Sequence, residues 1–206
     1  YTWNRASSNY SPFRPSTKCG EWNFVRSARP VFPLFFVISD ELKDINNEEI
    51  IKEIKESKPL SSNIHLTHNE DLGLAKDKSC KDLLKQLDEM FKEMEKAVVL
   101  ECEELWGQVT NKDMCCGIHT HYNADQPNRN GYSFVYYANA EKDSGNLVFD
   151  LEYGQKRYDT DIEPKTGLLI IFPLNIKHFT RRNTTDNERV SVAGNYIITG
   201  KKDDNN

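Results

Sequence analysis

The chain has 206 residues, enough for one hydrophobic core with extensions and too few for two sizeable independent domains. Hydrophobic residues make up 37% and charged residues 29%, and no apolar stretch approaches the length of a membrane-spanning helix, so a membrane protein is not expected. The net charge is −5 and basic residues are scattered among acidic ones, which argues against duplex nucleic acid as a partner.

The five cysteines are odd in number and follow no regular framework. This usage indicates reduced thiols, as in a cytoplasmic protein, and not a secreted disulfide scaffold. Cys115 and Cys116 are adjacent and lack the two-to-four-residue spacing that a zinc knuckle needs.

Residues 1–30 are rich in Ser, Pro, Asn and Arg, with six aromatic side chains among them. The segment has neither a helical nor a strand period. We expect an N-terminal arm that packs on the domain, docks on a partner or mediates self-association, because six aromatic rings need something to bury them. A loosely ordered tail is the alternative.

We predict that residues 31–206 form one domain. A strand is expected at Val31–Ile38 and a short amphipathic helix at Asn47–Glu56, followed by a polar connection over residues 58–78. His65 and His68 lie in this connection, and we interpret them as surface histidines.

The pattern over residues 79–105 predicts a long amphipathic helix, since apolar residues recur there at intervals of three and four. Its apolar stripe is typical of packing against a sheet. We therefore expect helical support over about residues 47–105. The stripe consists of Leu83, Leu84, Leu87, Met90, Phe91, Met94, Val98, Cys102 and Leu105.

From Cys115 onward, short β-rich runs alternate with turn residues, which predicts an antiparallel sandwich or barrel over about residues 108–199. A long helix followed by such a series suits a jelly-roll barrel buttressed on one side by helices. The predicted strands are Tyr132–Ala138, Gly145–Leu151, Gln155–Tyr158, Gly167–Phe172 and Arg189–Ile198.

Three of the five histidines stand beside strand-like runs: His119 and His121, two residues apart, and His178 further on. A pair of ligands at this spacing plus one distant His can hold a redox metal in a small β-barrel while leaving coordination positions open.

Arg189 and Ser191 open an alternating run, so a strand would send both side chains to the same face. A planar guanidinium and a hydroxyl on one face make a ready clamp for a carboxylate.

Taken in order, His119-x-His121, the Tyr132–Tyr137 run, His178, Arg189-x-Ser191 and Asn195 give a sequence that resembles the iron(II)- and 2-oxoglutarate-dependent oxygenases. Within that superfamily it is similar to a group of small bacterial and phage oxygenase-like proteins whose first metal motif reads His-x-His. The resemblance covers roughly residues 115–198.

The resemblance implies a double-stranded β-helix, or jelly-roll, with Fe(II), 2-oxoglutarate and O₂ as cofactor and cosubstrates. It implies His119, His121 and His178 as metal ligands and Arg189 with Ser191 at the distal carboxylate of 2-oxoglutarate. Alternate residues of a strand face inward, and we assign Tyr136 as another donor inside the barrel.

The second metal ligand departs from the superfamily pattern, because most members have a carboxylate where this chain has His121. An imidazole binds iron well but brings no negative charge. The alternative ligand set is His121, Asp125 and His178.

The resulting prediction is a cytoplasmic enzyme, or a virion-associated one if the source is a phage, that hydroxylates a small molecule or protein and releases succinate and CO₂. One competing hypothesis is a non-catalytic jelly-roll that serves as a binding or virion assembly module. Another is a cupin-like metal enzyme that does not use 2-oxoglutarate. Fold analogy alone cannot fix the substrate.

Overall fold

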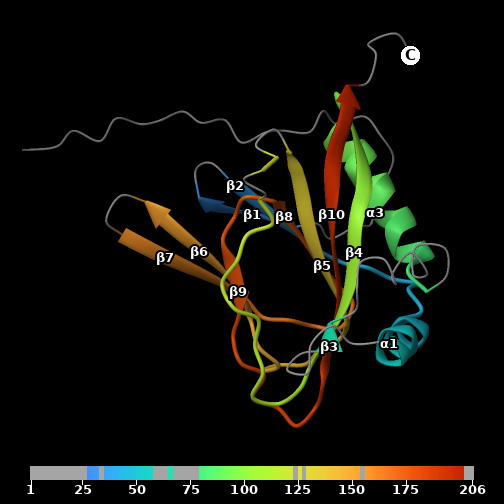
Figure 1. Ribbon diagram of the computed structural model, residues 1–206, viewed down its shortest axis with the longest axis vertical. Coiled ribbons are helices and arrows are strands. Elements are labelled where there is room, and N and C mark those ends of the chain that lie inside the picture. The colour runs from blue at the N-terminus through green and yellow to red at the C-terminus, as the bar shows by residue number, and fades with distance from the viewer. Residues whose placement is uncertain are drawn as a thin grey trace, which may run out of the picture.

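The computed structural model describes residues 27–32, 35–57, 65–66, 79–122, 125–126, 129–153 and 156–201. These residues form ten strands and two helices (Figure 1). The elements are β1 (Ser27–Phe32), β2 (Phe35–Glu41), α1 (Asn47–Glu56), β3 (His65–Leu66), α3 (Lys81–Met94), β4 (Val98–Thr110), β5 (Gly131–Asn139), β6 (Leu147–Tyr153), β7 (Lys156–Ile162), β8 (Leu168–Pro173), β9 (His178–Thr180) and β10 (Arg189–Lys201).

The strands make two antiparallel sheets. The larger has the order β1-β2-β8-β5-β10-β4-β3, and the smaller has the order β7-β6-β9. Figure 1 shows the smaller sheet on one side of the larger and the two helices on the other. The prediction of a mainly β fold with flanking helices is therefore confirmed.

Helix α1 forms where the sequence predicted it. The Asn46 side chain accepts a hydrogen bond from the backbone N–H of Glu49 at 3.2 Å and so caps the helix. Its buried side chains, Ile50 and Ile54, face the large sheet. Gly107 of β4 makes room for this contact, because a Cβ there would lie 2.4 Å from the Ile54 side chain.

Helix α3 is shorter than predicted, and the extension to Leu105 was wrong. The helix ends at Met94, and residues from Val98 onward form β4, which pairs along its length with β10. Val98, Cys102 and Leu105 fit a helical spacing, but they lie in a strand whose burial alternates toward its C-terminal end. Pairing with a thirteen-residue neighbouring strand supplied backbone hydrogen bonds that the local pattern did not reveal.

Five predicted strands, those matching β5, β6, β7, β8 and β10, are confirmed to within a few residues. The predicted first strand corresponds to β1 and β2, which pair with each other. Strands β3, β4 and β9 were not predicted. The N-terminal arm lies outside the described residues except for 27–30, which belong to β1.

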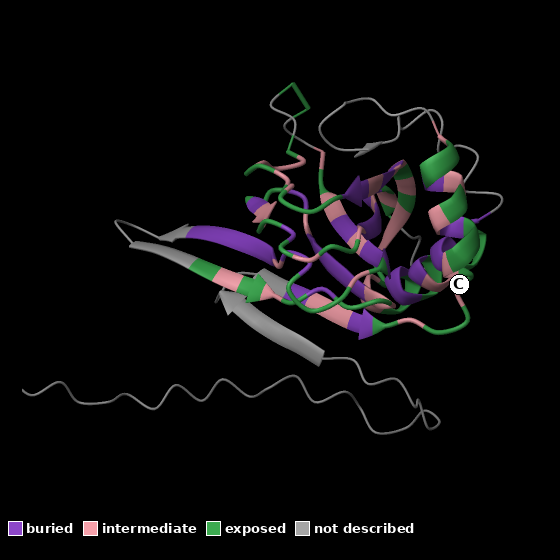
Figure 2. Cartoon of the chain, turned by 90° about the horizontal axis from the view of Figure 1, so that it is seen from below, coloured by how far each residue is buried: buried purple, intermediate pink, exposed green. Residues whose placement is uncertain are grey.

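The large sheet packs on both sides. One apolar cluster fills the space between this sheet and the helices and includes Leu83, Phe91, Phe134 and Tyr196. The other lies between the two sheets, where the rings of Phe149 and Phe172 approach with centroids 5.1 Å apart. In Figure 2 buried residues run along the strands, whereas the helices carry exposed residues on their outer sides.

Neither helix in the described part of the chain is long and apolar enough to cross a membrane.

Candidate metal centre and anion site

The structure brings the three predicted histidines together. One ligand atom from each of His119, His121 and His178 lies within 4.8 Å of the other two. Their ring centroids are 4.2 to 5.2 Å apart. Asp125, the alternative ligand, is exposed and does not belong to this group.

Backbone pairing positions two of the ligands. His119 donates its N–H to the carbonyl of His178 at 3.0 Å, and His178 donates in return to the carbonyl of His119 at 2.9 Å. The N–H of His121 bonds to the carbonyl of Leu174 at 3.1 Å. The segment that follows β4 is thus attached to the start of β9 and to the turn before it.

Backbone carbonyls also fix the protonation of two rings. Nδ1 of His119 lies 2.8 Å from the carbonyl oxygen of Gly117, and Nδ1 of His178 lies 2.9 Å from that of Ile176. A carbonyl can only accept a hydrogen bond, so each Nδ1 carries a proton, and Nε2 is the atom of each ring that is placed to bind a metal.

The third ring, His121, is held by side chains. Its Nδ1 lies 2.7 Å from Oδ1 of Asn195 and 2.7 Å from Oγ of Ser133. The indole of Trp106 packs edge-on against the ring, with centroids 5.2 Å apart.

Burial keeps two of the imidazoles neutral. Desolvation lowers the pKa of His178 to about 3, with the nearby His119 adding to the effect. Desolvation likewise lowers the pKa of His121 to about 4, partly offset by its hydrogen bond to Asn195. Both rings are therefore neutral at neutral pH, the state in which an imidazole binds metal.

The site is closed on one side and open on the other. His178 is buried against Phe149 and Phe172, whereas His119 and His121 are half-buried. Ile118 and Tyr122, which flank the two half-buried ligands in sequence, are among the exposed large apolar residues.

The inner face of the large sheet is the one that turns toward the smaller sheet. Arg189 lies on this face, as Asn195 does, and is only 1% exposed. It donates to the carbonyls of Ser144 and Gly145, at 3.1 and 2.5 Å, and to the hydroxyls of Thr110 and Thr180, both at 3.2 Å.

Among the described residues, the charge of Arg189 has no counter-ion. No carboxylate of the described residues pairs with it, and its Nε has no hydrogen-bond partner among them. Burial lowers the pKa of this guanidinium, yet arginine stays charged in proteins. A buried, unpaired cation is costly, and an anionic ligand would offset that cost.

The tyrosine beside this cation is Tyr137 and not Tyr136, which corrects the sequence assignment. Tyr136 points toward the helices, where its hydroxyl donates to Oδ1 of Asn47 at 2.8 Å. Tyr137 is paired in register with Ser191, and burial raises its pKa to about 12. Its hydroxyl has no partner among the described residues. Alternation predicts two faces but does not say which one is inside.

Two supports of Arg189 were missed from the sequence. Gly145 has φ +101°, and a Cβ there would lie 2.7 Å from the guanidinium. Asn183 is fully buried, and its amide donates to the carbonyls of Thr110 and Asn187, at 3.0 and 2.8 Å, which fixes the loop before β10. The glycine in a turn-rich segment was the only local signal for either residue.

Comparison with known proteins agrees with this arrangement at the level of the fold. No protein-family model and no curated protein matches the sequence. Solved structures do match. An oxidoreductase of the 2OG-Fe(II) oxygenase family from Burkholderia pseudomallei is 15% identical with a TM-score of 0.57, and the match covers 79% of this chain and 85% of that one. The chain has the fold of the 2-oxoglutarate- and iron(II)-dependent oxygenases.

Two further structures show how varied the proteins with this fold are. The epimerase SnoN from nogalamycin biosynthesis, in complex with Fe³⁺, alpha ketoglutarate and nogalamycin RO, is 11% identical with a TM-score of 0.61, covering 79% of this chain and 78% of that one. A prolyl-4-hydroxylase from Pseudomonas putida is 18% identical with a TM-score of 0.54, covering 75% and 86%.

Proposed function

We propose that this protein is an iron(II)- and 2-oxoglutarate-dependent oxygenase that hydroxylates its substrate and releases succinate and CO₂. The observation that carries the proposal is Arg189, a buried guanidinium with no counter-ion among the described residues. It lies on the sheet face whose Asn195 and Ser133 contact His121, one of the three convergent histidines. We interpret the two facing sheets as the jelly-roll barrel of this superfamily. Among the proteins with this fold, an epimerase retains the metal and the 2-oxo acid, so the reaction type is part of the proposal.

The residues present fit both groups. Three convergent imidazoles, of which His119 and His178 bond to carbonyls through Nδ1 and so turn Nε2 to the site, suit a divalent first-row metal and leave its remaining positions open. The Nε of Arg189 and the hydroxyl of Tyr137, both without a hydrogen-bond partner in the described part of the chain, suit a carboxylate, which accepts several hydrogen bonds. Iron(II) with O₂ would supply the oxidation of substrate, coupled to the decarboxylation of 2-oxoglutarate.

The order of residues along the inner face supports this assignment. Ser133 pairs with Asn195 beside the metal ligand His121, and Tyr137 pairs with Ser191 next to Arg189. These two pairs are four residues apart, which is about 13 Å at the usual rise per residue of a strand. We therefore assign Arg189, Ser191 and Tyr137 to the distal carboxylate of 2-oxoglutarate, leaving its 2-oxo acid end to face the metal.

The test is an anaerobic titration of Fe(II) into the metal-free protein, with and without 2-oxoglutarate. We expect a weak visible charge-transfer band that needs both ligands and is lost in Arg189→Met, which fills the space without the charge. Arg181→Met, at an exposed arginine paired with Asp161, is the matched control and should keep the band.

Iron binding without a 2-oxoglutarate-dependent band would contradict the cosubstrate assignment and favour a metal enzyme of another class. Failure to bind iron at all would contradict the enzyme proposal and leave the binding-module hypothesis. Arg189→Met must still bind iron, which shows that the variant has folded.

A further inference from the structure

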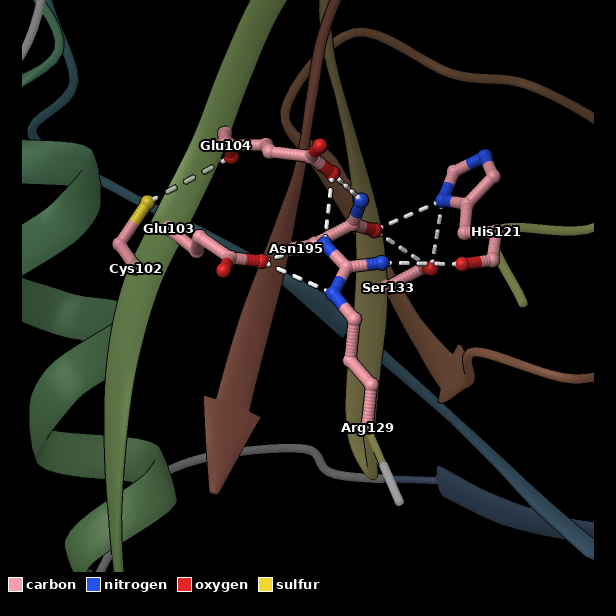
Figure 3. Close-up of polar contacts among 7 residues, drawn as sticks. All are labelled: Cys102, Glu103, Glu104, His121, Arg129, Ser133 and Asn195. Atoms are coloured by element: carbon pink, nitrogen blue, oxygen red, sulfur yellow. Dashed lines mark hydrogen bonds and ion pairs between the residues drawn. The ribbon is translucent and has the colours of Figure 1, made fainter. Parts of the chain in front are cut away.

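A line of side chains runs from the metal ligand His121 to a carboxylate on β4. Oδ1 of Asn195 lies 2.7 Å from Nδ1 of His121, and the other end of the same amide, Nδ2, donates to the carboxylate of Glu104. Figure 3 shows Asn195 between the imidazole on one side and Glu104 on the other. β10 carries Asn195 and pairs with β4, where Glu104 is its register partner.

The hydrogen bonds in this line can run in only one direction. A carboxylate only accepts, so Glu104 requires the NH₂ end of the Asn195 amide to face it. The amide oxygen must then face His121, and because that oxygen also only accepts, Nδ1 of His121 must carry the proton. The hydroxyl of Ser133 donates to the same oxygen at 2.8 Å, consistent with this orientation. The lone pair of His121 is thereby left on Nε2.

Arg129 holds both ends of the line. Its NH2 donates to the Glu104 carboxylate at 3.0 Å, and its NH1 donates to the backbone carbonyl of His121 at 3.0 Å. The Arg129 side chain is only 10% exposed, while that of Glu104 is 34% exposed. The carboxylate therefore sits at the edge of the site, oriented by a nearly buried guanidinium.

This arrangement bears on the charge of the site. Three imidazoles contribute no negative charge to a bound cation, and position 121 holds a histidine where most of the superfamily has a carboxylate. Asn195, which is buried and only 2% exposed, connects the carboxylate of Glu104 to His121. A carboxylate in a ligand's outer hydrogen-bond network raises the basicity of the imidazole and fixes its tautomer.

We propose that Glu104, acting through Asn195, is a positioning residue for the metal: it fixes His121 as the Nδ1–H tautomer and supplies from outside the ligand set the negative charge that the ligands lack. The inference rests on the metal-binding part of the proposed function and does not involve 2-oxoglutarate.

The test compares Glu104→Gln with Glu103→Gln. Both glutamates bond to Arg129, but only Glu104 bonds to Asn195. We measure Zn²⁺ affinity by calorimetry without 2-oxoglutarate. Glu104→Gln should weaken binding about tenfold or more, the usual effect of removing such an outer partner. Glu103→Gln, which loses a largely exposed ion pair, should change it by no more than about twofold.

A second readout separates this role from a purely structural one. In the metal-free protein, ¹⁵N chemical shifts of the histidine rings report the tautomer. Wild type and Glu103→Gln should show His121 protonated at Nδ1, whereas Glu104→Gln should show a mixture, because a glutamine can face Asn195 with either end. Asn195→Leu should weaken Zn²⁺ binding to a similar extent, and the double variant should lose little more than either single one.

Equal Zn²⁺ affinities and equal tautomers in the two glutamine variants would overturn the inference while leaving the metal site intact. Additive losses in the double variant would overturn it too. Absence of Zn²⁺ binding by the wild type would instead contradict the metal site on which the proposed function depends, so the two failures are distinguishable.

Discussion

The two faces of the large sheet differ in chemistry, one being apolar and the other polar, and neighbouring residues of β5 and β10 show the contrast. Phe134 and Tyr196 point to the helices and are covered by an apolar cluster. Ser133, Tyr137 and Asn195 point to the smaller sheet, where buried polar groups meet histidines and an arginine. The helix face is an apolar core that holds the fold together, whereas the inner face carries buried polar groups, which we propose bind the metal and 2-oxoglutarate.

The largest loss of stability is expected from a substitution in the apolar cluster between the large sheet and the helices. Phe134→Ala removes a fully buried ring that packs near Tyr196, with centroids 6.0 Å apart. We expect a loss of about 3–5 kcal/mol in the free energy of unfolding, measured by urea denaturation. The folded fraction should keep its Zn²⁺ affinity. A variant that kept its stability and lost the metal would contradict the division between the faces.

Removing a histidine from the inner face should have the opposite effect, with a large loss of Zn²⁺ affinity and a small loss of stability. His178→Ala removes a ligand wedged against Phe149 and Phe172, and Zn²⁺ affinity should fall by more than about 100-fold, beyond the loss from an outer partner. The free energy of unfolding of the metal-free protein at neutral pH should fall far less in His178→Ala than in Phe134→Ala. Calorimetric titration and urea denaturation of the same sample check both statements.

Adjacent tyrosines give the sharpest paired test. Tyr137→Phe should weaken 2-oxoglutarate binding to the iron-loaded protein by about tenfold or more, since hydrogen bonds to charged groups contribute roughly 1.5–3 kcal/mol. Tyr136→Phe should leave that affinity unchanged and cost about 1 kcal/mol of stability, through loss of its bond to Asn47. The reverse pattern in the titrations would restore the original assignment of Tyr136.

The smallest effect expected near neutral pH is the dependence of stability on the protonation of His178 and His121. The pKa values of His178 and His121 are lowered to about 3 and 4 from an ordinary value of 6.5, so below about pH 6.5 the unfolded chain binds more protons than the folded one. The free energy of unfolding of the metal-free protein should therefore be flat above about pH 7 and fall between pH 6.5 and 4. Urea denaturation at several pH values should show that the free energy of unfolding depends less on pH in His178→Ala than in the wild type.

The sequence was informative where a short motif supplies the candidate site. The spacing of His119, His121 and His178 was enough to predict a site that the fold assembles, and alternation was enough to place Arg189 and Ser191 on one face. The same alternation led to the wrong tyrosine, because a period of two does not identify the inward side.

Other features depend on contacts between distant segments. The end of the predicted helix was wrong because Val98 and Leu105 continue the helical spacing of the apolar stripe, and only their pairing with the distant β10 shows that they lie in a strand. Glu104 and Arg129 are 25 residues apart (129 − 104), and nothing in either local sequence indicates that they meet at His121. Asn195 was singled out by the resemblance, but its role needed the three-dimensional arrangement.

The reciprocal backbone pairing of His119 and His178 affects how the metal is taken up. These residues are 59 positions apart (178 − 119), yet amide and carbonyl groups join them independently of their side chains. Two ligands are therefore preorganised before any ion arrives, and the conformational entropy of bringing them together is lost during folding and not during metal binding. A chelator should thus remove the metal without unfolding the two sheets, and the metal-free protein should rebind it rapidly, with the amides of both histidines protected from hydrogen exchange throughout.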